Sequence, residues 1–172
     1  ILTKIPVKEQ IICRVDLGIN TDAVCTIMRS DGTVLGRKFI DFPSEKDRMY
    51  RVLGRIRKFQ REHGAVQAKS RWAYAKSLNI ELGRKIAGAV TKYAKENRAD
   101  IIVFEYLETK GKISGKKKQK LHLWRKRDIQ KRCEHQVHRN GIRVSRICAW
   151  NTSRLAYDGT GAVARDQKNH SL

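Results

Sequence analysis

Two acidic residues end strand-like apolar segments, a position at which a carboxylate suggests a chemical role. Asp16 closes residues 11–16, and Glu105 closes residues 101–105. A carboxylate deep in a fold is costly unless it is hydrogen-bonded, paired with a cation or coordinated to a metal ion. Two neighbouring carboxylates also repel each other, and Mg²⁺ is the usual divalent ion for oxygen ligands. We therefore expect Asp16 to lie deep in the fold, and both acids to bind Mg²⁺ if they meet.

The chemistry of such a site is phosphodiester cleavage. Two metal ions about 3.5 to 4 Å apart can activate a water molecule and stabilise the leaving oxygen. The alternative for each acid is structural. Asp16 would then cap the turn that begins at Leu17 and Gly18, and Glu105 would be a solvated strand end.

The elements that must position these acids follow from the apolar periodicity and the turn residues. Strands are predicted at 11–17, 23–28, 33–40, 101–105 and 142–147, and helices at 44–63, at 72–97 and before Gly141. Ser44 is the predicted N-cap of the first helix, with Asp47 three residues later. Hairpin-length turns make the first three strands antiparallel, whereas the helical crossovers make the last two parallel to a neighbour.

We therefore predict an α/β fold with a mixed five-stranded sheet, three strands antiparallel and then two parallel, flanked by helices. If the fourth strand pairs with the first, Asp16 and Glu105 lie at adjacent carboxyl ends. Ligand sites of open α/β sheets lie at those ends. The two acids would then meet in one site.

The charge of the chain indicates a polyanionic partner. The 172 residues contain 38 Lys and Arg against 17 Asp and Glu, a net charge of +21. Between Lys110 and Arg146 there are fourteen basic residues and two acids. The predicted nucleic-acid contacts are Lys116, Lys117, Lys118, Lys120, Trp124, Arg125, Lys126 and Arg127. The alternative is a solvated basic helix with Trp124 in the core. No membrane span or signal peptide is evident, so we expect a location inside a cell.

The ordered set of motifs resembles a known family. Residues 15–19 resemble the first RuvC motif of the RNase H-like nucleases, and residues 101–107 resemble the second. Residues 123–130, 141–144 and 151–153 are similar to the nuclease half of TnpB proteins, which are transposon-encoded, RNA-guided DNA endonucleases related to type V CRISPR effectors. The resemblance covers most of residues 10–160.

The resemblance implies an RNase H-like nuclease domain over residues 1–150, split by a basic loop and helix at 108–140. Asp16 and Glu105 would be its catalytic metal ligands, holding two Mg²⁺ ions, with Mn²⁺ as a substitute. A guide RNA and a DNA substrate would be the partners, and the prokaryotic cytoplasm the location. We expect residues 151–172 to be loosely ordered or truncated.

The chain departs from the family at two points. The family needs a third carboxylate, and Asp166 only partly resembles the corresponding segment, so we expect that acid beyond Leu172. This chain alone would then cleave weakly or not at all. The family's zinc-ribbon cysteines do not follow Thr152 and Ser153, so we expect no zinc in this chain.

Two other functions stay open on the sequence alone. One is a nucleic-acid-binding module without catalysis, and the other is a RuvC-like resolvase that works without a guide. The sequence gives no indication of the oligomeric state, the guide or the target.

Overall fold

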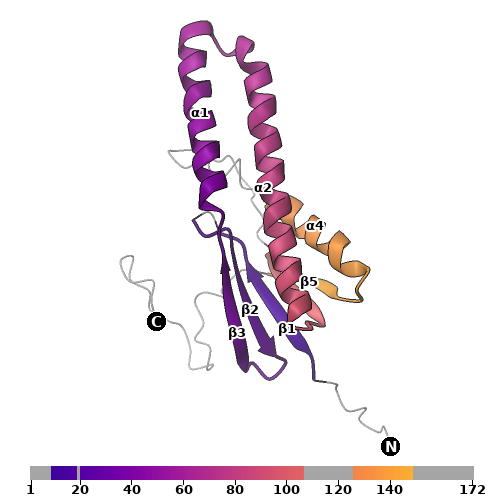
Figure 1. Ribbon diagram of the computed structural model, residues 1–172. Helices are drawn as coiled ribbons and strands as arrows, with labels where there is room; N and C mark the ends of the chain where they lie inside the picture. The colour runs from indigo at the N-terminus through magenta and orange to yellow at the C-terminus, as the bar shows by residue number, and fades with distance from the viewer. Residues whose placement is uncertain (1–8, 19, 107–125, 149–172) are drawn as a thin grey trace, which may run out of the picture.

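The computed structural model of the chain describes residues 9–18, 20–106 and 126–148. Five strands form one mixed sheet in the order β3-β2-β1-β4-β5, with β1 at its centre (Figure 1). The strands are β1 Ile11–Asp16, β2 Ala23–Arg29, β3 Val34–Ile40, β4 Ile101–Tyr106 and β5 Arg143–Cys148. Strands β1, β2 and β3 are antiparallel, and β4 runs parallel to both β1 and β5. The predicted α/β sheet is therefore confirmed.

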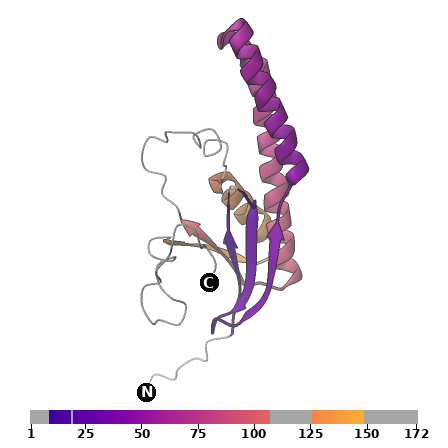
Figure 2. The ribbon, with the colours of Figure 1, turned by 90° about the vertical axis from the view of Figure 1, so that its left-hand side faces the viewer.

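One face of this sheet is covered by helices. The helical elements are α1 Pro43–His63, a 3₁₀ turn at Val66–Ala68, α2 Lys69–Glu96 and α4 Lys126–His138. Along β1 the side chains alternate, because successive residues of a strand point to opposite faces. Cys13 and Val15 are buried, whereas Arg14 and Asp16 are exposed. The lower part of α2 packs with α4 along the sheet, as the turned view in Figure 2 shows.

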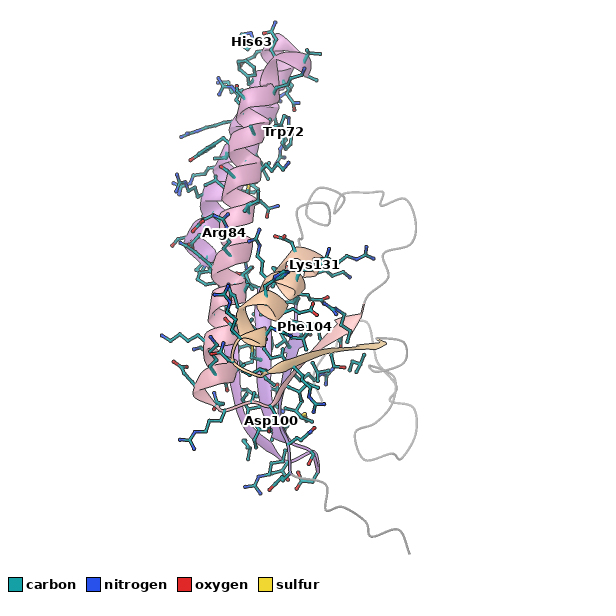
Figure 3. The ribbon with its side chains drawn as sticks, turned by 90° about the vertical axis from the view of Figure 1, so that its right-hand side faces the viewer. His63, Trp72, Arg84, Asp100, Phe104 and Lys131 are labelled. Atoms are coloured by element: carbon teal, nitrogen blue, oxygen red, sulfur yellow. The ribbon has the colours of Figure 1, made fainter. Side chains whose placement is uncertain are left out.

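The main core lies between the sheet and these two helices. Phe104 and Ile102 of β4 are fully buried, together with Val90 of α2 and Val137 of α4. Figure 3 shows Phe104 beneath α4. The apolar run that precedes Glu105 thus anchors that acid's strand in the centre of the fold.

A second core holds α1 against the first half of α2. Its buried members include Met49, Leu53 and Ile56 of α1 and Ala75 of α2. The two helices project beyond the sheet as a hairpin (Figure 1). This core explains why α1 carries an apolar stripe although most of its length lies away from the sheet.

The predicted N-cap of α1 is wrong. The helix begins at Pro43, one residue before Ser44, and no side chain caps it. A proline fits the first turn because its missing N–H would have had no helical partner. The backbone N–H of Phe42 instead donates to the buried carboxylate of Asp22, at 2.8 Å. A contact between residues distant in sequence therefore replaces the local cap.

Within the described residues, no helix is long and apolar enough to cross a membrane.

Candidate active site: an acid pair at the carboxyl edge of the sheet

Asp16 and Glu105 occupy equivalent positions on neighbouring parallel strands. Val15 of β1 is aligned with Phe104 of β4, so the next residue on each strand is one of the two acids. Both carboxylates line a small cavity of about 10 Å³, which is room for about one water molecule. The predicted meeting of the two strand ends is therefore confirmed.

The expected depth of Asp16 is wrong. Its strand is central, but the side chain lies on the face opposite α2 and is exposed. The strand alternation explains this, because buried Val15 precedes it and buried Leu17 follows it. Partial burial raises the pKa of Asp16, the negative charge of Glu105 raises it further, and Arg14 opposes both effects. The protonated form of Asp16 is therefore favoured relative to an ordinary aspartate.

Arg14 forms an ion pair with Glu105, a contact that the sequence prediction missed. Its Nη2 lies 3.0 Å from Oε1 of Glu105. The arginine side chain is 47% exposed and the glutamate 19% exposed, so solvent screens the pair only in part. Two positions before Asp16 on the same strand, Arg14 must share its face. This two-residue spacing is the sequence signal that places Arg14 beside the acid pair.

Gly18 keeps the turn after Asp16 tight. A Cβ atom at this position would lie 2.5 Å from the carbonyl oxygen of Thr21, closer than any real contact allows. Any side chain would therefore push the backbone that follows Asp16. Steric exclusion of a Cβ atom thus explains why glycine occupies position 18, two residues after Asp16.

Helix α4 closes the other side of the cavity with Lys126 and Gln130. Lys126 is only 6% exposed, and its pKa is lowered by burial and by the charge of Arg127, with Glu105 opposing. The side-chain amide of Gln130 donates to the backbone oxygen of Glu105 at 3.2 Å and accepts from Nε of Arg146 at 3.4 Å. Gln130 thus ties β4 to α4 and β5, a role without a signal in the sequence.

The predicted nucleic-acid contacts are only partly described. Arg127 is exposed in the first turn of α4, whereas Lys126 lies against the acid pair instead of on an open surface. The other predicted positions and Asp166 lie outside the described residues. These positions are Lys116, Lys117, Lys118, Lys120, Trp124 and Arg125.

The donor set suits a hard cation in part. Two carboxylates offer oxygen ligands, and a cation would relieve the repulsion that raises the pKa of Asp16. Among the described residues, however, no group of three or more His, Cys, Asp or Glu side chains could hold a metal ion. Within the described residues, the acid pair therefore offers a cation two carboxylates and no third acidic, histidine or cysteine ligand.

A second and much larger cleft lies elsewhere. It has a volume of about 810 Å³ and is lined by Lys95 of α2 and by Glu134, His135, His138 and Arg139 of α4. Its lining is mainly basic, and it does not include either acid of the pair. We therefore place the candidate chemistry at the acid pair, where the strand ends converge, and not at the larger cleft.

Comparison with known proteins supports the fold and leaves the sequence family open. No protein-family model and no curated protein matches the sequence. A cryo-EM structure of a Cas12f1–sgRNA–target DNA complex matches 94% of this chain with a TM-score of 0.66 and 17% identity. A CRISPR-Cas12f ternary complex matches 92% with a TM-score of 0.63 and 18% identity. The chain spans 41% and 33% of those two proteins. It therefore has the fold of a region of these type V CRISPR effectors.

Proposed function

We propose that this chain is the RNase H-like nuclease domain of a TnpB-like, RNA-guided DNA endonuclease. The observation that carries the proposal is the alignment of Asp16 and Glu105 at adjacent parallel strand ends, in a chain of net charge +21. The similarity to Cas12f complexes that contain sgRNA and target DNA supports a guide RNA and DNA as partners.

In this proposal Asp16 and Glu105 hold Mg²⁺, and Mn²⁺ can replace it. Bound Mg²⁺ would activate water and neutralise charge at the scissile phosphate. Gln130 positions the strand that carries Glu105, and Gly18 keeps the turn after Asp16 tight. The third carboxylate of the ligand set would come from outside the described residues.

Cleavage of labelled single-stranded DNA in Mg²⁺ or Mn²⁺ tests the proposal. We expect slow cleavage by this chain and none by Asp16→Asn or Glu105→Gln. Asp31→Asn is the control, because Asp31 is an exposed acid in the β2–β3 turn, and it should cleave as the wild type does. Cleavage that survives Asp16→Asn would contradict the assignment of the acids.

Binding of Mn²⁺ and of RNA separates the remaining alternatives. Loss of Mn²⁺ binding in Asp16→Asn supports the metal site even where cleavage is too slow to detect. RNA that copurifies with the chain supports a guide, whereas its absence favours a guide-independent resolvase.

One observation favours a second candidate, a nucleic-acid-binding module without catalysis. Arg14 already neutralises Glu105 through a 3.0 Å ion pair, which leaves the acids a structural role. In that case the wild type and Asp16→Asn would bind Mn²⁺ equally weakly, and neither would cleave DNA.

A further inference from the structure

The α1–α2 hairpin concentrates positive charge away from the acid pair. Residues 48–76 contain nine Lys and Arg but only one acid, Glu62. The hairpin projects beyond the sheet, with His63 at its tip and Trp72 on its α2 arm (Figure 3). Packing within the hairpin needs only its apolar seam, so the charge calls for another explanation.

Part of this charge forms a row along α1. Arg48, Arg51, Arg55 and Lys58 follow one another at steps of three or four residues, so they share one side of the helix. All four side chains are exposed. Among the described residues, no acid forms an ion pair with Arg51 or Arg55, and Lys58 meets Glu62 only at 4.0 Å.

Arg48 of this row and Arg71 beside it each contact an aromatic residue of the other helix of the hairpin. The guanidinium of Arg71 in α2 lies 4.0 Å from the ring centroid of Phe59 in α1. Nη2 of Arg48 in α1 donates to the hydroxyl of Tyr74 in α2 at 2.7 Å. These contacts bring α2 to the same side as the row. We call Arg48, Arg51, Arg55, Lys58 and Arg71 the hairpin stripe.

We propose that the hairpin stripe binds the phosphate backbone of a nucleic-acid duplex. Guanidinium groups are suited to phosphate because they present several donors in a planar fork. Contacts with Phe59 and Tyr74 restrict two of these groups before binding, which lowers the entropy lost on binding. The positive charge of the hairpin stripe thus complements the negative charge of a nucleic-acid backbone.

A duplex suits this surface better than a single strand. Proteins that bind single strands stack bases on free aromatic rings. On this side of the hairpin, the rings of Phe59 and Tyr74 already contact the guanidinium groups of Arg71 and Arg48, so they are not free to stack on bases. From Arg48 to Lys58 the row spans about 15 Å, since a helix rises about 1.5 Å per residue. That length matches about four base pairs at about 3.4 Å each.

The test compares two double variants of the same helix. Arg51→Gln with Arg55→Gln removes two charges from the stripe. Arg57→Gln with Arg61→Gln removes two exposed arginines of equal spacing, about 120° around the helix. Binding of a labelled RNA or DNA duplex of about 20 base pairs is measured by fluorescence anisotropy over a series of NaCl concentrations. EDTA is present, so the result does not depend on the acid pair or on the proposed function.

The stripe variant should bind at least about tenfold more weakly, with a salt slope smaller by about 2, since each lost phosphate contact removes about 0.9. The Arg57/Arg61 variant should lose clearly less affinity, and Arg51→Lys with Arg55→Lys should keep most of it. Equal losses of duplex affinity in both double variants would overturn the proposal, because binding would then depend on the overall positive charge of α1 and not on the hairpin stripe. The proposal would also be overturned if the chain bound a single strand more tightly than the duplex and if Trp72→Ala weakened that single-strand binding. Circular dichroism spectra matching the wild type show that the variants fold.

Discussion

At the scale of single residues, the acid pair combines two carboxylates that repel each other with one arginine that partly neutralises them. Asp16 is disfavoured as a carboxylate by partial burial and by the charge of Glu105, and Arg14 offsets this only in part. A divalent cation would interact with both carboxylates at once. The same ion must compete with the guanidinium of Arg14 for Glu105.

Removing Arg14 should therefore strengthen metal binding. We expect Arg14→Gln to bind Mn²⁺ about three- to tenfold more tightly, because Glu105 is then free of its ion pair and a positive charge whose repulsion of the ion costs about 1 kcal/mol is removed. Titration followed by the electron paramagnetic resonance signal of free Mn²⁺ measures the affinity. Arg29→Gln is the matched control, since Arg29 pairs with Glu9 at 3.3 Å on the surface and should leave the affinity unchanged. Weaker binding in Arg14→Gln would show that the arginine supports the site.

The raised pKa of Asp16 predicts how its replacement affects stability. Because the folded-state pKa lies above the ordinary value of 3.8, the protonated side chain favours folding, and this contribution is lost as the pH rises through the folded pKa. At neutral pH without metal, Asp16→Asn should thus melt slightly higher than the wild type, by at most about 2 °C.

The difference should shrink as the pH falls toward 3.8, because wild-type Asp16 is then protonated as well. Thermal unfolding followed by circular dichroism over a pH series measures it. A variant that melts lower at neutral pH would mean that the Asp16 carboxylate stabilises the fold.

At the scale of elements, the turn after β1 and the helix α1 use glycine in opposite ways. Gly18 lies where a Cβ atom would collide with the oxygen of Thr21, whereas a Cβ atom at Gly54 in α1 would meet nothing within 4 Å. The first glycine is required by close backbone approach. The second only weakens its helix, because glycine has a low helix propensity.

The same substitution should therefore have opposite effects at these two positions. Gly18→Ala should lower the free energy of unfolding by about 1–3 kcal/mol, since the backbone after Asp16 must shift. Gly54→Ala should raise it by about 0.5–1 kcal/mol. Urea unfolding measures both changes. A neutral Gly18→Ala variant would mean that the turn has room to relax and that Gly18 does not help to position Asp16.

The sheet could be predicted from sequence because its order depends on connection lengths. Short turns at 20–22 and 30–32 force antiparallel pairing, and long helical crossovers force β4 and β5 to run parallel. The position of Asp16 and Glu105 at adjacent strand ends follows from that order. Features that depend on side-chain packing could not be predicted in the same way.

Three particular misses illustrate this limit. Asp16 was expected to be buried, but one face of the central strand carries the core and the other carries the acid. Ser44 is the predicted cap of α1, but the residue before that helix, Phe42, is held by Asp22 in the β1–β2 turn. Gln130 has no signal in the sequence, because its contact with the backbone of Glu105 depends on how α4 packs.

At the scale of the whole molecule, the hairpin rises from the same edge of the sheet as the acid pair. Strands β1 and β3 are both antiparallel to β2, so they run in the same direction. Helix α1 begins shortly after β3 ends, near the edge where Asp16 ends β1 (Figure 2). A duplex bound along the hairpin stripe would therefore extend from the same end of the sheet as the acid pair.

The central claim is that Asp16 and Glu105 bind a divalent cation. Crystals of the chain soaked in Mn²⁺ and measured at the manganese absorption edge test it most directly. We predict an anomalous peak between the two carboxylates that is missing in Asp16→Asn crystals, with Arg14 displaced from Glu105. An empty site with the Arg14–Glu105 ion pair intact, in crystals soaked with Mn²⁺ in large excess, would contradict the account and leave the acids with a structural role.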